Sequence, residues 1–288
     1  MLQCLKRGGD NLHFLARIIN ILDADMTTPT MYGWFHLLFI VLTIGGAVAL
    51  CKCFKNPSHK TVKKILLVFS LVSIVLEIYK QINYTYSYDG TAITADYQWY
   101  AIPFQFSSTP MYIALLAAVI GHKKTHYALS AYLATFSLFA GVCVMVYPAQ
   151  VFISTIGINI QTMICHGSMI SVGAFLLASG YVKTEHKTVL YATPVFAVMV
   201  VLASVMNEIA FATGLLERET FNMFFISPYC EPSLPVYSWV QAVVPYPWCA
   251  IIYIVAFSLA AYIILLIVRA AKNIFSKNKA QEKTPVMV

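Results

Sequence analysis

The sequence predicts an all-α, polytopic membrane protein built as a bundle of seven transmembrane helices, and three observations support this. Of 288 residues, 59% are hydrophobic and 11% are charged, with a mean hydropathy of +0.73, whereas soluble domains are roughly 25% charged. Long apolar runs recur along the chain without strand-like alternation. Because backbone amides must pair inside hydrocarbon, runs of about 20 apolar residues are predicted to be helices.

Seven runs have the required length, and no linker between them is long enough to hold another domain. They cover residues 34–54, 64–84, 100–120, 127–147, 159–181, 189–215 and 248–269. Residues 1–30 precede them and contain "LHFLARIINILDADM", which has helical spacing but is too polar to span. We therefore expect an interfacial amphipathic segment at 1–30, the seven-helix domain at 31–271 and a basic cytoplasmic tail at 272–288.

The first two runs carry polar residues near one end. His36 opens the first run. In the second run Glu77 faces both Lys80 and Gln81, because residues three and four positions apart are neighbours on a helix. Glu77 and Lys80 are predicted to point inward and to neutralise each other, because a charge facing lipid at mid-membrane costs about 2.5 to 3.5 kcal/mol.

The third run contains the stretch "IPFQFSSTPMY", with Gln105, Ser107 and Ser108 between Pro103 and Pro110. On a regular helix Ser108 shares a face with Gln105, while Ser107 points about 100° away. One serine is then expected to face any cavity. Each proline lacks an N–H and loosens the local hydrogen-bond ladder.

The later runs differ in polarity. The fourth run is apolar, whereas the fifth places Asn159, Thr162 and His166 on one helical face. The sixth carries Asn207 and Glu208. The seventh has no internal lysine to hold retinal, which argues against a light-driven pump, and D-R-Y and N-P-x-x-Y patterns typical of G-protein-coupled receptors are absent.

Lysine and arginine set the orientation, because cytoplasmic connections are enriched in both. Fourteen of them fall on one side of the predicted topology and four on the other. This places the N-terminus outside, the C-terminus in the cytoplasm, and the protein in the cell membrane. The net charge of +7 follows from this topology and from anionic inner-leaflet lipid, so membrane lipids are expected partners and nucleic acid is not.

With this orientation, polar residues of five runs lie in the outer half of the membrane. One interpretation is interhelical hydrogen bonding, worth about 0.6 kcal/mol for each bond. The other, which we favour because hydrogen bonds between helices need not gather at one depth, is a polar cavity. Its expected lining is His36, Glu77, Lys80, Gln81, Gln105, Ser107, Ser108, Asn159, His166, Asn207 and Glu208.

The cysteines do not have the spacing of metal ligands, and no metal or cofactor is expected. Cys230 and Cys249 both fall on the outer side, where an oxidising compartment would allow a disulfide. The sequence leaves the oligomeric state open.

The chemistry that these residue types allow is assisted nucleophilic attack, with a serine hydroxyl, a histidine and carboxylates as its parts. We find no G-x-S-x-G elbow, H-E-x-x-H motif or phosphate loop. Gln105 or Asn207 is a candidate donor to an oxyanion. A second class of function, binding, sensing or transport of a small ligand, uses the same cavity without chemistry.

Five stretches carry a resemblance to a known family: "WFHL", "IPFQFSSTPMY", "GINIQTMICHG", "NMFF" and, later in the chain, "PYPW". Over roughly 31–269 the chain resembles the YwaF family of bacterial integral membrane proteins, which is related to the vertebrate acyltransferase called transmembrane protein 164. The resemblance implies a seven-helix fold and transfer of a fatty acyl chain between phospholipids through a cysteine nucleophile.

Carried over residue by residue, the family's cysteine falls on Ser107, its histidine on His166 and its loop asparagine on Asn222, which joins the expected cavity lining. The serine is a departure, because a hydroxyl is a poorer nucleophile than a thiol and needs a base. Either His166 supplies that base, or this chain does not perform the family's chemistry.

Overall fold

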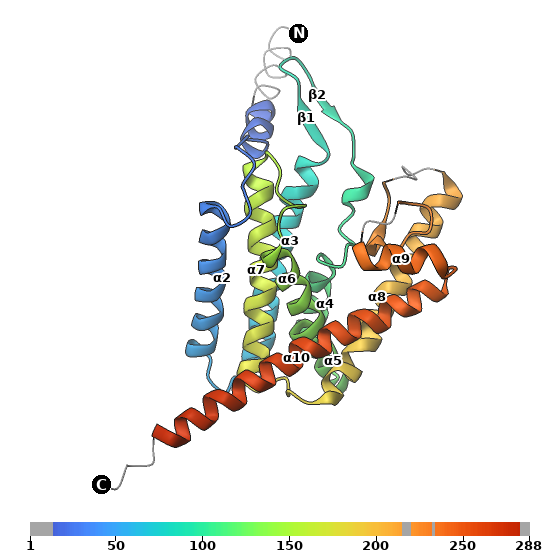
Figure 1. The fold of residues 1–288 in the computed structure, drawn as a ribbon. Helices are drawn as coiled ribbons and strands as arrows, with labels where there is room; N and C mark the ends of the chain where they lie inside the picture. Colours follow the sequence, from blue (N-terminus) through green and yellow to red (C-terminus); the bar gives the residue numbers. More distant parts are fainter. Residues whose placement is uncertain (1–13, 215–219, 232–233, 283–288) are drawn as a thin grey trace.

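The computed structural model describes residues 14–214, 220–231 and 234–282, and these are mostly helical (Figure 1). Residues 14–22 are helical. The longer helices that follow are α2 (Trp34–Cys53), α3 (His59–Asn83), α4 (Thr109–Val119), α5 (Lys123–Tyr132), α6 (Leu138–Val146), α7 (Ile156–Ala178), α8 (His186–Thr213), α9 (Pro235–Val243) and α10 (Trp248–Glu282). Short elements are β1 (Tyr86–Tyr88), β2 (Ile93–Ala95), the 3₁₀ turns Trp99–Ala101 and Met223–Phe225, and a π-helical turn, Leu133–Ser137, that joins α5 to α6.

In the described part of the chain, six helices are long and apolar enough to cross a membrane. They are α2, α3, the continuous stretch Lys123–Val146, α7, α8 and Trp248–Ile274 of α10. Each matches one predicted run within a few residues. The protein is therefore a multi-pass, helical membrane protein, as the composition predicts.

The predicted third run, residues 100–120, is not one helix. A 3₁₀ turn ends at Ala101, Ile102 is extended with φ −44° and ψ 132°, and α4 begins only at Thr109. The prolines explain the break: a proline disfavours helical geometry in the residue before it, as at Ile102, and is well tolerated in a first helical turn, where Pro110 lies. At 1.5 Å per residue, α4 is about 16 Å long, roughly half of the hydrocarbon thickness. The prediction of one continuous helix over 100–120 is wrong, and the count of seven spans stays a prediction.

The bundle has two ends that we name by their contents. The hairpin end holds the antiparallel pair β1–β2, in which Tyr86 lies opposite Ala95, and it also holds the N-terminal segment (Figure 1). That segment is fastened there, since Met26 N–H donates to Ser154 O at 2.6 Å and Tyr79 Oη donates to Leu22 O at 2.7 Å. The opposite, lysine end holds the connection between α2 and α3. The predictions that the hairpin end faces outward and that residues 14–22 lie on the membrane surface stay predictions.

Helix α7 is the centre of one half of the bundle, because α2, α3 and α6 all pack against it. The close approach is possible because Gly141, Gly167 and Gly173 lack side chains; a Cβ atom at Gly167 would lie 2.3 Å from Thr43 Oγ1. In the other half α8 and α10 pack around stacked aromatic rings, among them Phe136 and Phe196 with centroids 4.6 Å apart. The two halves leave polar side chains of α3 and α7 facing a space near the hairpin end.

Candidate functional site

A cavity of about 270 Å³ lies near the hairpin end of the bundle, between α3, the segment that precedes α4, and α7. The loop before α7 covers it with Gln150, Val151 and Ile153. We call it the polar cavity. Its polar lining residues are Ser73, Glu77, Lys80, Tyr84, Ser107, Ser108, Gln150, Gln161, Thr162, Cys165 and His166. Five of the residues predicted from the sequence are therefore brought together: Glu77, Lys80, Ser107, Ser108 and His166.

His166 has the hydrogen-bonding pattern of a base. Its Nδ1 lies 2.7 Å from the carbonyl oxygen of Thr162, and only a protonated nitrogen makes that contact. In the neutral ring Nε2 therefore keeps its lone pair. Nε2 is buried and has no hydrogen-bond partner, although the side chain lines the polar cavity. A lone pair is thus left without a partner on a side chain that lines the cavity.

Glu77 and Lys80 form the predicted ion pair, with Lys80 Nζ 2.8 Å from Glu77 Oε1. Gln81 Nε2 donates to the same oxygen at 2.7 Å. The pair faces the cavity from one turn of α3, so its two charges compensate each other next to the space. Tyr84, just beyond the end of α3, also lines the cavity, and burial raises the pKa of its phenol to about 12.

Ser107 and Ser108 both line the cavity, contrary to the expectation that only one could. The expectation assumed a regular helix, whereas residues 102–108 form turns, with Ser108 N–H donating to Gln105 O at 2.8 Å. Helix α4 starts directly after the serines. Its N-terminus, the positive end of the helix dipole, therefore lies beside both hydroxyls.

Sequence reasoning missed Gln161 and Cys165, which line the cavity from α7. Gln161 Nε2 lies 3.7 Å from Cys165 Sγ, a weak contact that leaves the amide available to a ligand. The signal was present, because residues 161, 162, 165 and 166 follow the helical spacing that groups one side of α7. Cys165 directly precedes His166, and its thiol is a second nucleophilic group in this space.

Three predicted cavity residues instead hold the loop that precedes α9, and we call Gln105, Asn207 and Asn222 the amide cluster. Gln105 donates to Asn222 O at 2.9 Å and accepts from Phe224 N–H at 3.0 Å. Asn207 donates to Met223 O at 3.1 Å and accepts from Met223 N–H at 2.8 Å. Asn222 Oδ1 accepts from Ser227 N–H at 2.9 Å. Gln105 and Asn207 each make two hydrogen bonds to the loop and neither lines the polar cavity, and their predicted role as an oxyanion donor stays a prediction.

Asn159 and His36 are also structural rather than part of the cavity lining. Asn159 accepts from Ile153 N–H at 3.0 Å and donates to Ile153 O at 2.7 Å, which fixes the loop before α7. His36 accepts from Tyr32 N–H through Nδ1 at 2.9 Å, and its Nε2 lies 2.9 Å from Met145 O. For both residues the hydrogen-bonding interpretation holds.

Gln81 and Glu208 lie outside the polar cavity as well. Gln81 donates to Ala101 O at 2.8 Å and accepts from Tyr97 Oη at 2.6 Å, so it joins α3 to the segment that follows the hairpin. Glu208 accepts from Tyr229 Oη at 2.7 Å, and this hydrogen bond is the largest cause of the raised pKa of Tyr229.

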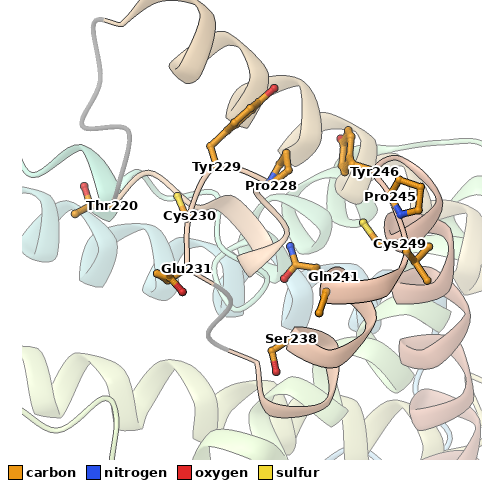
Figure 2. Close-up of a pocket in the computed structure, with 12 residues that line it drawn as sticks. Thr220, Pro228, Tyr229, Cys230, Glu231, Ser238, Gln241, Pro245, Tyr246 and Cys249 are labelled. Atoms are coloured by element: carbon orange, nitrogen blue, oxygen red, sulfur yellow. The ribbon is translucent and has the colours of Figure 1, made fainter.

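A larger pocket of about 890 Å³ lies between the loop around Tyr229, helix α9 and the start of α10 (Figure 2). Cys230 and Cys249 line it from opposite sides, and both are thiols rather than a disulfide. Among the described residues that line it there is no histidine, and its carboxylate, Glu231, is exposed. It lacks a paired base and nucleophile, so the polar cavity is the stronger candidate site.

Comparison with known proteins gives one match. A model of the TMEM164 family matches residues 30–267, which include α2 to α9 and the first part of α10. The searches of curated proteins and of solved structures found no match to the chain. All the residues that line the polar cavity fall inside the matched range.

Proposed function

Because the chain belongs to the TMEM164 family, we propose that its polar cavity carries out acyl chemistry on a membrane phospholipid, either transfer of the acyl chain to a second lipid or its hydrolysis. The observation that carries the proposal is the buried, unpartnered Nε2 of His166, on a side chain that lines a cavity together with Ser107 and Ser108. A buried polar atom without a partner is costly and calls for an explanation. A role as general base explains it.

In the first step the Ser107 oxygen attacks the ester carbonyl of the lipid, and His166 Nε2 takes the hydroxyl proton. The carbonyl oxygen becomes an oxyanion. Lys80, the Gln161 amide and the N-terminus of α4 are the positive or donor groups around the cavity that can stabilise it. When the carbon–oxygen bond to glycerol breaks, His166 returns the proton to the departing oxygen, and the acyl chain stays on Ser107 as an ester.

The second step reverses the first with a different acceptor. A lipid hydroxyl gives acyl transfer, and water gives hydrolysis; in either case His166 takes the proton of the acceptor and returns it to Ser107. His166 keeps one orientation through both steps, because its Nδ1–H is bonded to the Thr162 carbonyl. This is the role that a third group plays for the base in serine-dependent hydrolases.

Binding without chemistry is the second candidate, and one observation favours it. In the part of the chain that the structure describes, no hydrogen bond joins the Ser107 hydroxyl to His166. Catalytic hydrogen bonds are often long before substrate binds, so the absence of this bond is compatible with an enzyme. A half-helix whose N-terminus faces a cavity, as α4 does, is also a feature of transporters that bind anionic groups.

The test is the phospholipid acyl composition of cells that overexpress the protein. Wild type should change the composition, and Ser107→Ala and His166→Ala should abolish the change, since general-base catalysis contributes roughly 100- to 10,000-fold. Ser107→Cys should retain or increase it, and Ser73→Ala, a serine change elsewhere in the cavity lining, should leave it intact. Unchanged profiles for wild type and Ser107→Cys, with ligand still bound to the purified protein, would favour binding.

A further inference from the structure

A second space, which we call the apolar groove, lies on the membrane-facing side of α7 between α2 and α3. Its volume is about 540 Å³. Residues of α2 from Phe39 to Leu50 and of α3 from Ile65 to Val72 form its walls, and α7 forms its floor. Both α2 and α3 pack on α7, but they do not pack closely on each other. The space between the two helices is therefore open along their length.

The hydroxyl groups of the groove are all turned away from its interior. Thr43 Oγ1 donates to Phe39 O at 2.7 Å, Ser171 Oγ to Thr43 O at 3.0 Å, and Ser168 Oγ to Cys165 O at 2.8 Å. With those groups satisfied by the backbone, the groove presents a hydrocarbon surface. This is the opposite of the polar cavity, where His166 Nε2 has no partner.

The apolar groove lies next to the polar cavity, and Phe69 belongs to both linings. On α3 the polar cavity is lined from Phe69 to Lys80 and the groove from Ile65 to Val72, so the two linings overlap at residues 69–72. On α7 they overlap at residues 163–169. The two spaces are therefore neighbours along α3 and α7 that differ in polarity, and the groove extends further toward the lysine end.

The length of the groove matches one leaflet. Its α2 wall, from Phe39 to Leu50, is about 16 Å long at 1.5 Å per residue, and half of a bilayer hydrocarbon core is roughly 15 Å. An acyl chain that extends from an ester in the polar cavity would therefore meet an apolar groove about as long as one leaflet is thick. We propose that the apolar groove binds one acyl chain of the phospholipid whose ester group enters the polar cavity, an inference that rests on the proposed function for its substrate class.

The experiment uses the full-length His166→Ala protein in nanodiscs, so that binding is read without turnover. The probe is a phosphatidylcholine with a diazirine at the end of one acyl chain, and peptide mass spectrometry locates its adducts after illumination. Adducts should concentrate at Leu50 and Ile65, the lysine end of the groove, over Val41 and Ile44, which are exposed on α2 outside the groove. Adducts spread evenly over both sets would overturn the proposal.

Variants that fill the groove give an independent readout. Ala49→Phe with Val68→Phe narrows both walls, while Val41→Phe with Val75→Phe adds the same rings at exposed positions outside the groove lining. Native mass spectrometry should show phospholipid retention about tenfold lower for the first pair. A lipid that loses the burial of about two methylene groups is expected to bind about tenfold more weakly. Equal retention in both pairs, or a groove occupied by a second copy of the chain, contradicts the assignment.

The outcomes separate the two proposals. Adducts in the groove without any change of cellular acyl composition would leave the chain-binding groove standing and remove the acyl chemistry. A changed acyl composition with evenly spread adducts would keep the chemistry and remove the groove.

Discussion

His36 and His166 are both buried imidazoles, on two helices that pack together, and their hydrogen bonds differ. His36 uses both nitrogens, one with the backbone N–H of Tyr32 and one with the carbonyl of Met145. His166 uses only Nδ1, and its Nε2 lies at a cavity without a partner. The first pattern fixes helix ends in place, whereas the second leaves a lone pair for a ligand.

The same difference divides the other buried polar residues into two regions. In the amide cluster each side chain is matched to the backbone of residues 222–227, where Phe224 and Phe225 have the strained positive φ angles of 59° and 58°. In the polar cavity Lys80 and Glu77 compensate each other, and the serines, Gln161 and His166 line the space, with His166 Nε2 left without a partner. These residues share one predicted membrane depth, so depth does not separate them. Their hydrogen-bond partners show which of them support the fold.

The largest expected effect is on stability in the amide cluster. Asn207→Leu leaves the N–H of Met223 without a partner and its carbonyl with only the 3.4 Å contact from Ile226 N–H, so the free energy of unfolding should fall by up to roughly 6 kcal/mol, at about 1 to 3 kcal/mol for each group. His166→Leu should change it little, because Nε2 has no partner to lose. Thermal unfolding of the purified proteins measures both, and an equal loss in the two variants would remove the distinction between the regions.

The next effect concerns the ion pair at the edge of the polar cavity. Glu77→Leu leaves Lys80 uncompensated and should destabilise the protein by about 3 kcal/mol, the lower range for a buried pair that loses one partner. The double change Glu77→Leu with Lys80→Leu should be milder, because no charge remains. The same unfolding temperatures for the single and double variants would mean that the pair has no energetic coupling.

The smallest effect on stability is expected for single cysteine substitutions that test the orientation of the bundle. Their labelling decides which leaflet the polar cavity faces. In a cysteine-free background, Ser58→Cys and Thr184→Cys at the lysine end should resist a membrane-impermeant thiol reagent in intact cells. Ala92→Cys, beside the β1–β2 hairpin, should react. The reverse pattern would place the cavity in the inner leaflet.

The sequence predicted much of the fold because apolar length alone identifies a membrane helix. It failed at residues 100–120, where composition suits a span but Pro103 breaks the helix and Gln105 is held by a loop more than a hundred residues away. The spacing of polar and apolar residues along the sequence carries no signal of such a long-range contact. The same limit explains why Glu77, Lys80, Ser107 and His166 were grouped correctly, while Asn207 was placed in the cavity instead of the amide cluster.

The alternatives at the site could not be decided from residue types, because a hydrogen bond to the backbone and a cavity both require polar atoms at one depth. Cys165 illustrates the converse case. It lines the polar cavity, and its helical spacing places it on the same side of α7 as Gln161 and Thr162, although its residue type alone does not distinguish it from a core residue.

The most direct test of the account is covalent labelling of purified protein by an alkyl fluorophosphonate, which reacts with serines that a base activates. We predict one adduct on Ser107, mapped by peptide mass spectrometry, with a rate that falls by about 100-fold or more in His166→Ala and is unchanged in Ser108→Ala. An adduct formed at the same rate in His166→Ala, or no adduct on Ser107, would contradict the claim that the unpartnered nitrogen of His166 serves a reactive serine.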